Sequence, residues 1–186
     1  MSKLVQNIFL IGPMGSGKTT IGKQLANLLK LDFYDCDQEL EHQTGASVSL
    51  IFDVEGEAGF RTRESRLLEQ LTAKKGVLIS TGGGVICKEE NRSLLHTRGL
   101  VVYLKTSIEN QLRRLSQDKS RPLLQTEDRA QRLLDLARER NPLYDSTADL
   151  VYSTGNQSVY NTAKELCAII LKHLDPLNED HPHADG

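Results

Sequence analysis

The sequence predicts one α/β domain of three layers, with a parallel sheet between two layers of helices. Short apolar runs alternate with stretches whose apolar residues recur at helical spacing, and this alternation is typical of parallel strands joined by crossover helices. A chain of 186 residues has the length of one domain. Hydrophobic residues make up 38% of the chain and aromatic residues only 5%, so we expect an aliphatic core.

The apolar runs predict the strands. Three of the runs do not alternate with polar residues, so we expect their strands to be buried on both faces of the sheet: Ile8 to Ile11, Val77 to Ile79 and Leu100 to Leu104. A fifth and weaker strand is predicted over Leu31 to Tyr34. The four stronger runs are Ile8 to Ile11, Val77 to Ile79, Leu100 to Leu104 and Asp149 to Tyr152.

The amphipathic stretches predict the helices. In the first of them, Ile21, Leu25 and Leu28 recur at a spacing that places them on one helical face. The stretches are Lys18 to Lys30, Gly59 to Lys75, Ser107 to Gln117, Glu127 to Arg140 and Ser158 to His173.

Composition excludes several functional classes. Seven of the twelve arginines lie between Arg113 and Arg140, but acidic residues are interspersed among them, so this segment does not predict nucleic-acid binding. The longest apolar run, Leu166 to Leu171, has six residues, whereas a membrane span needs about 20. The three cysteines are widely separated and form no CxxC pair. We expect a cytoplasmic protein with neither a membrane nor a nucleic-acid partner.

Residues 12–19 read Gly-Pro-Met-Gly-Ser-Gly-Lys-Thr and match the phosphate-loop pattern Gly-x4-Gly-Lys-Ser/Thr. A glycine-rich turn with a chance Lys-Thr pair is disfavoured, because the segment follows a predicted strand and opens a predicted helix. Lys18 would direct its charge at the β- and γ-phosphates, and the Thr19 hydroxyl would bind Mg²⁺. The predicted nucleotide contacts in this segment are Gly15, Ser16, Gly17, Lys18, Thr19 and Thr20.

Two aspartates, Asp35 and Asp37, follow the second predicted strand, at the sheet edge where ligands of parallel sheets bind. In an extended segment their carboxylates would project to the same side, so that one orients Mg²⁺ through water and the other accepts a hydroxyl proton. The alternative is a helix cap, since Asp35 and Gln38 have the spacing of a capping box.

Gly82-Gly83-Gly84 follows the strand predicted from Val77, again at a carboxyl edge. Without side chains, its backbone N–H groups can approach a bound anion or hydroxyl closely. The alternative is a plain loop after a strand.

Several arginines are candidates for an anionic ligand. Arg61, Arg63 and Arg66 share one amphipathic stretch that is rich in glutamate, and periodicity does not single out any of them. Arg121 lies in a loop between two predicted helices and could act as a lid arginine over a triphosphate. Arg140 precedes Asn-Pro, so we expect it to close its helix, where its charge would equally suit the helix dipole.

From about Asn7 to Leu174 the chain resembles shikimate kinase, a family of P-loop proteins related to nucleoside monophosphate kinases. In this order and spacing, the motifs that carry the resemblance are specific to that family. They are Gly12 to Thr19, Phe33 to Asp37, Gly59 to Arg61 with Glu64, Thr81 to Gly84, Arg121 to Leu124, and Arg140 to Tyr144.

The resemblance implies that ATP phosphorylates the 3-hydroxyl of shikimate, in the pathway to chorismate and the aromatic amino acids. Lys18, Asp37 and Arg121 would carry the catalysis. The family's substrate aspartate falls on Asp37, its carboxylate-binding arginines on Arg61 and Arg140, its substrate-contacting glycine on Gly83 and its lid arginine on Arg121.

The resemblance also implies the nucleotide and metal contacts. The magnesium hydroxyl falls on Thr19, with Asp35 reaching the ion through water. Gln157 matches a nucleotide contact near the adenine, in the most variable loop of the family.

The family fold implies a five-stranded parallel sheet in the order 2-3-1-4-5. We expect a single P-loop kinase domain over residues 1–174, with a lid at about 112–126 and a substrate-binding region at about 38–64. The acidic, proline-containing tail over 175–186 is expected to be disordered, and the protein to be a monomer.

Two other functions compete with this one. A gluconate or nucleoside monophosphate kinase would share the fold, but a nucleotide acceptor asks for a base-recognition site. A nucleotide-switched binding module would need switch loops and an apolar partner surface, neither of which the sequence shows.

Overall fold

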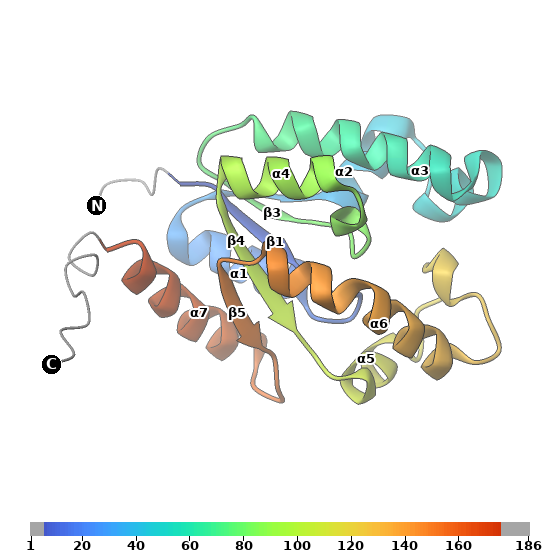
Figure 1. The fold of residues 1–186 in the computed structure, drawn as a ribbon. Helices are drawn as coiled ribbons and strands as arrows, with labels where there is room; N and C mark the ends of the chain where they lie inside the picture. The colour runs from blue at the N-terminus through green and yellow to red at the C-terminus, as the bar shows by residue number, and fades with distance from the viewer. Residues whose placement is uncertain (1–5, 176–186) are drawn as a thin grey trace, which may run out of the picture.

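The central sheet has five parallel strands in the order β2-β3-β1-β4-β5 (Figure 1), so the predicted fold class and strand order are confirmed. The computed structural model describes residues 6–175, and the predicted disorder of the tail concerns residues that lie almost entirely outside this range. The strands are β1 (Ile8–Ile11), β2 (Asp32–Asp35), β3 (Val77–Ser80), β4 (Leu100–Lys105) and β5 (Leu150–Ser153).

The three runs predicted to be buried are the centre of the sheet. In β1, Leu10 pairs with Ser80 of β3 on one side and with Val102 of β4 on the other. All four residues of β1 and all four of β3 are buried. β5 is an edge strand, and its Val151 is 52% exposed.

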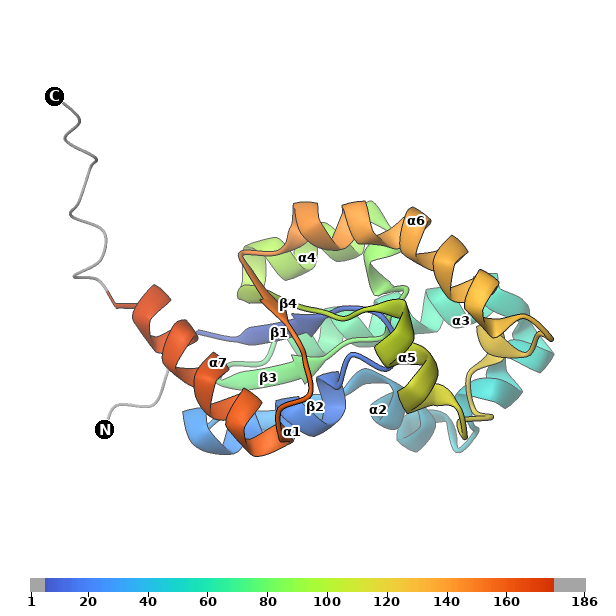
Figure 2. The same cartoon turned by 90° about the horizontal axis from the view of Figure 1, so that it is seen from below.

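Helices cover both faces of the sheet, and Figure 2 shows α1 and α7 on one face and α4 and α6 on the other. Because side chains alternate along a strand, Ile8 and Leu10 pack toward α1 and α7, while Phe9 and Ile11 pack toward the opposite helices. The helices are α1 (Lys18–Leu29), α2 (Cys36–Thr44), α3 (Val48–Thr72), α4 (Glu89–Arg98), α5 (Ile108–Leu115), α6 (Arg129–Thr147) and α7 (Val159–His173), with short 3₁₀ turns η1 (Val85–Cys87) and η2 (Pro122–Leu124).

Two helices were not among the amphipathic stretches predicted from apolar periodicity, although the capping-box alternative places a helix start at Asp35. Helix α2 buries only Cys36 and Leu40, and α4 buries only Asn91 and Leu95. With so few buried apolar residues, neither helix has the apolar periodicity on which the prediction of a helix rests.

Two other helices are longer than predicted. α3 begins at Val48 and is kinked at Gly56, whose φ of 72° and ψ of 178° are not helical. α6 continues through Pro142 to Thr147, so the expectation that Arg140 closes its helix is wrong. The buried stripe continues past the proline, and the packing of Tyr144 compensates for the backbone hydrogen bond that proline removes.

Among residues 6–175, no helix is both long and apolar enough to cross a membrane.

Candidate active site

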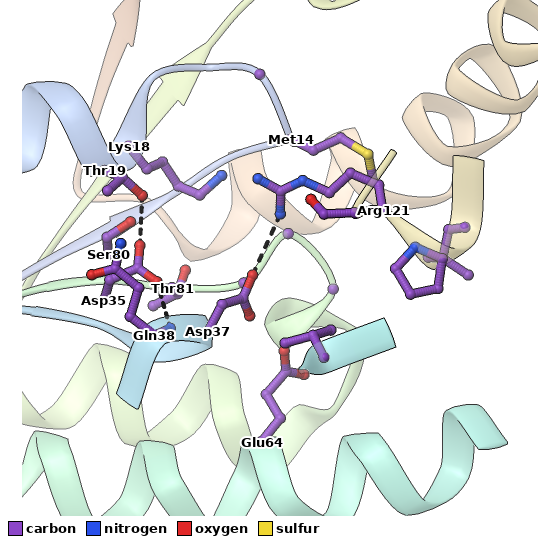
Figure 3. Close-up of a pocket in the computed structure, with 18 of the residues that line it drawn as sticks. Met14, Lys18, Thr19, Asp35, Asp37, Gln38, Glu64, Ser80, Thr81 and Arg121 are labelled. Atoms are coloured by element: carbon purple, nitrogen blue, oxygen red, sulfur yellow. Dashed lines mark hydrogen bonds and ion pairs between the residues drawn. The ribbon is translucent and has the colours of Figure 1, made fainter. Parts of the chain in front are cut away.

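A cleft of about 510 Å³ opens at the carboxyl ends of the central strands (Figure 3). Its walls come from the loop after β1, the start of α2, the middle of α3, the loop after β3, the loop before η2, and α6. The phosphate loop, Asp37, Arg61, Gly83, Arg121 and Arg140 all line this one cleft. The fold therefore brings together predicted residues that are spread over more than a hundred positions of the sequence.

The phosphate loop lies between β1 and α1, as its motif requires. Gly17 is the N-terminal cap of α1 and has a left-handed φ of 90°, a conformation that favours glycine. This turn points the first backbone N–H groups of α1 into the cleft, where the helix dipole adds positive potential. The loop is thus built to bind a phosphate group.

Lys18 lies on the floor of the cleft and is only 8% exposed. Its Nζ donates to the carbonyl oxygens of Gly12 at 2.8 Å and Pro13 at 2.9 Å. Burial, helped by the charge of Arg121, lowers the pKa of Lys18 to about 7, although the carboxylate of Asp37 opposes this shift. A bound triphosphate would supply the negative charge that favours the protonated lysine.

Thr19 of α1 and Asp35 of β2 are in contact beside the phosphate loop, and Figure 3 shows them pointing toward each other. Thr19 Oγ1 donates to Asp35 Oδ2 at 2.5 Å, and Asp35 Oδ1 accepts a hydrogen bond from the backbone N–H of Gln38 at 3.0 Å. Asp35 therefore caps α2, as the capping-box alternative predicted, and it also lines the cleft. Its role in orienting Mg²⁺ stays a prediction.

Asp37 is not in an extended segment, contrary to our expectation, but in the first turn of α2. Its Oδ2 lies 3.4 Å from Arg121 Nη1, across the cleft (Figure 3). Burial and the neighbouring Asp35 raise the pKa of Asp37, while the charges of Arg121 and Lys18 lower it. A raised pKa makes this carboxylate a better proton acceptor than a solvated aspartate.

Arg61 is distinguished from its neighbours by its partner Glu64, a buried acid that is 3% exposed. Arg61 Nη1 donates to Glu64 Oε1 at 2.9 Å. Burial raises the pKa of Glu64, and the charge of Arg61 opposes this shift. By contrast, Arg63 pairs with Glu55 at the surface, and Arg66 is exposed.

The triple glycine places the two candidate carboxylate arginines next to each other. A Cβ atom on Gly84 would lie 2.3 Å from the guanidinium of Arg61, and one on Gly83 would lie 3.6 Å from Arg140 Nη1. A side chain at Gly84 would therefore displace the guanidinium of Arg61, whereas a Cβ on Gly83 would only reach ordinary contact with Arg140.

Two buried polar atoms at the cleft have no hydrogen-bond partner within the described part of the chain. They are Oε2 of Glu64 and Nε of Arg140, and Arg140 as a whole is only 5% exposed. A buried guanidinium normally has a charged or hydrogen-bonding partner. The unpaired Nε of Arg140 therefore fits an anionic ligand bound in the cleft.

Arg121 reaches the cleft from the loop between α5 and α6. Its Nε donates to Asp118 Oδ2 at 3.2 Å, and its side chain is 38% exposed. The residue lies over the phosphate loop and faces Lys18 and Asp37 (Figure 3). Movement of this segment as a lid stays a prediction.

Gln157 is exposed and does not line the cleft. The loop that contains Gln157 is instead joined to the phosphate loop by Arg114 of α5, a residue that the sequence analysis did not single out. Arg114 Nη1 donates to the carbonyl of Gly15 at 2.8 Å, and its Nη2 donates to that of Gly155 at 3.1 Å. Nothing in the periodicity of α5 separates Arg114 from Arg113, so only the structure could identify it.

Comparison with known proteins places this site in a family. The family model described as "Shikimate kinase" matches residues 14–173. The shikimate kinase of Pasteurella multocida is 53% identical over 166 residues, which cover 89% of this chain and 95% of that protein. Shikimate kinase 1 of Erwinia tasmaniensis is 51% identical over 168 residues, with 90% of this chain and 97% of that protein covered.

Comparison with solved structures points to the same family. The shikimate kinase of Acinetobacter baumannii in complex with shikimate has a TM-score of 0.90 and 46% identity, and the match covers 92% of this chain and 96% of that one. A gluconokinase from Sinorhizobium meliloti is only 15% identical, with a TM-score of 0.60, so it shares the fold alone. The chain belongs to the shikimate kinase family, and it is a kinase of that family by both sequence and structure.

Proposed function

We propose that this cleft transfers the γ-phosphoryl group of ATP to the 3-hydroxyl of shikimate, in the pathway to chorismate. The observation that carries the proposal is the convergence of Arg61 and Arg140 on the triple glycine, beside Asp37 and next to the phosphate loop. The shikimate bound to the Acinetobacter relative supports the choice of acceptor.

The acceptor half of the cleft suits a small acid with several hydroxyl groups. Shikimate carries one carboxylate and three hydroxyls, and planar guanidinium groups such as those of Arg61 and Arg140 hold carboxylates through paired hydrogen bonds. Asp37 and the Gly83 backbone would bind hydroxyl groups. The cleft thus has a partner for each kind of polar group on shikimate.

The donor half supplies position and positive charge, which phosphoryl transfer needs more than covalent chemistry. The phosphate loop would hold the triphosphate, with Lys18 and Arg121 at the transferring group. Asp37 would orient the attacking hydroxyl and accept its proton, for which its raised pKa is suited. Gln157 lies outside the cleft, in the loop whose Gly155 carbonyl accepts from Arg114, and we keep it as the proposed contact to the adenine end of the nucleotide.

Thr19 and Asp35 fit a magnesium ion. Their side-chain oxygens are 2.5 Å apart at the edge of the phosphate loop, and Mg²⁺ prefers oxygen ligands. Thr19 would bind the ion directly and Asp35 through a water molecule. When bound, Mg²⁺ neutralises charge on the phosphates.

From the composition we also infer a cytoplasmic protein with no nucleic-acid or membrane partner, and from the family resemblance we infer a monomer.

The test is an assay of ADP release from ATP with shikimate, gluconate and AMP as separate acceptors. We expect release with shikimate at a rate at least about a hundredfold above that with the other two. A comparable rate with gluconate or AMP would identify a different kinase. Hydrolysis unaffected by any acceptor would instead indicate a nucleotide-switched module.

A further inference from the structure

Tyr144 is a buried tyrosine that the proposed reaction does not use. It lies on α6 one turn after Arg140, is 1% exposed, and stacks on Tyr103 of β4 with ring centroids 5.0 Å apart. Its hydroxyl donates a hydrogen bond to the backbone carbonyl of Gly83. The same face of α6 therefore provides an arginine of the acceptor site and a contact to the glycine loop.

The carbonyl groups of the triple glycine have different kinds of partners. The Gly82 oxygen accepts from the N–H of Val85 at 3.2 Å, and the Gly84 oxygen accepts from the N–H of Cys87 at 3.1 Å. These are bonds within the same turn. In the described part of the chain, Gly83 alone among the three glycines has its carbonyl bound by a side chain, and that side chain comes from another element.

This bond matters because glycine backbones have little to hold them in one conformation. The Tyr144 hydroxyl fixes the peptide plane between Gly83 and Gly84, and therefore the placement of Gly83 itself. Gly83 lies in ordinary contact with Arg140, because a Cβ on it would lie 3.6 Å from Arg140 Nη1. A shift of Gly83 would therefore change the alignment of the glycine backbone with this arginine.

The chemistry of the hydroxyl fits this role. Burial raises the pKa of Tyr144, with the charge of Arg140 acting in the opposite direction, so the phenol remains a neutral donor throughout the working pH range. The stack on Tyr103 restricts the ring, so the hydroxyl is presented to the loop with little loss of conformational entropy on binding.

We propose that Tyr144 is a positioning residue for shikimate, which acts by holding the Gly83 carbonyl and thereby aligning the glycine backbone with Arg140. The inference rests on the proposed assignment of Gly83 and Arg140 to the acceptor.

The test compares Tyr144→Phe with Tyr103→Phe in steady-state assays of the full chain. Tyr144→Phe removes the hydroxyl, which bonds to the Gly83 carbonyl and also interacts with the Arg140 side chain, and it keeps the aromatic stack. Tyr103→Phe is the matched control, because it makes the same chemical change in the same stack, and within residues 6–175 no hydrogen bond joins Tyr103 to the glycine loop.

For Tyr144→Phe we expect the KM for shikimate to rise at least about fivefold, while the KM for ATP and kcat stay within about twofold, as for loss of uniform acceptor binding. Tyr103→Phe should leave all three parameters within about twofold. Melting temperatures of both variants, measured in parallel, report on stability separately.

An unchanged KM for shikimate in Tyr144→Phe would overturn the inference, and so would equal changes in the KM for ATP or in the Tyr103→Phe control. A Tyr144→Phe protein that fails to fold would overturn it too, because the hydroxyl would then serve the fold. If the unaltered chain does not turn over shikimate at all, the proposed function fails, which the wild-type assay reveals independently of either variant.

Discussion

Arg121 and Asp37 form an ion pair across the cleft, with Nη1 3.4 Å from Oδ2, although 84 positions separate them in the sequence. The pair joins the loop before η2 to the first turn of α2. In the proposed reaction the two residues serve different partners, because Arg121 faces the transferring phosphoryl group and Asp37 faces the attacking hydroxyl. The reacting groups could lie between these side chains only after the ion pair opens, because 3.4 Å is a contact distance.

Arg121→Ala should reduce kcat by at least about a hundredfold, because the variant lacks a charge that acts on the phosphoryl group in the transition state. Binding of shikimate to the nucleotide-free protein should stay within about threefold. Stopped-flow or steady-state turnover gives the first value and calorimetry the second. Turnover within tenfold of the unaltered chain would remove Arg121 from the chemistry.

Lys18→Ala should abolish turnover and leave the fold intact, since the lysine bonds only to loop carbonyls and Ser16 in the described structure. Loss of this charge should cost at least about 3 kcal/mol of transition-state stabilisation, or about two orders of magnitude in rate. Turnover and circular dichroism measured on one sample test both halves of the prediction. More than a tenth of the wild-type rate would contradict it.

Arg61→Lys should raise the KM for shikimate by about tenfold or more, because an ammonium group cannot hold a carboxylate through two parallel hydrogen bonds. The controls are Arg63→Lys and Arg66→Lys on the same helix. Arg63 pairs with Glu55 at the surface, and Arg66 is exposed, so both should behave like the unaltered chain. Similar kinetics for all three variants would show that Arg61 has no special role.

Asp37→Asn should stabilise the fold while it inactivates the enzyme. Burial and Asp35 raise the pKa of Asp37 above its ordinary 3.8, so the ionised form costs the folded state free energy. This cost is absent below pH 3.8, grows as pH rises through the raised pKa, and is constant above it.

We therefore expect the melting temperature of Asp37→Asn to exceed that of the unaltered chain by about 1 to 4 °C at pH 8, and by much less at pH 4. The lost interactions with Arg121 and Lys18 oppose this gain, but the pair with Arg121 is partly exposed and so contributes little. Scanning calorimetry at the two pH values is the measurement. A lower melting temperature at pH 8 would mean that the ionised Asp37 stabilises the fold.

The sheet could be predicted from sequence because its central strands are buried on both faces, so Ile8–Ile11 and Val77–Ser80 are continuous apolar runs. The phosphate loop could be predicted because its residues are consecutive and their spacing is fixed by the chemistry. Helices α2 and α4 could not be predicted from periodicity, since they bury too few apolar residues to show one, and only the capping box at Asp35 indicated the start of α2.

The rest of the site depends on tertiary packing, which local patterns do not contain. Arg61 differs from Arg63 through tertiary contacts, because the buried Glu64 and the glycine loop at Gly84 lie beside it. Pro142 predicts a helix end near Arg140, but α6 continues to Thr147 because Tyr144 is buried. Arg114 contacts the carbonyl groups of Gly15 and Gly155, and both contacts span about forty residues or more.

The proposed reaction assigns Arg140 to the acceptor site and Arg121 to the donor site, a division of roles between the two arginines. Calorimetric titration of shikimate into nucleotide-free protein tests it most directly, with the unaltered chain, Arg140→Ala and Arg121→Ala compared under one condition. Arg140→Ala should lose about 1.5 to 3 kcal/mol of binding free energy, as for a charge-assisted hydrogen bond, and Arg121→Ala less than about 0.7 kcal/mol. Equal losses in the two variants would contradict the division and place both arginines in the acceptor site.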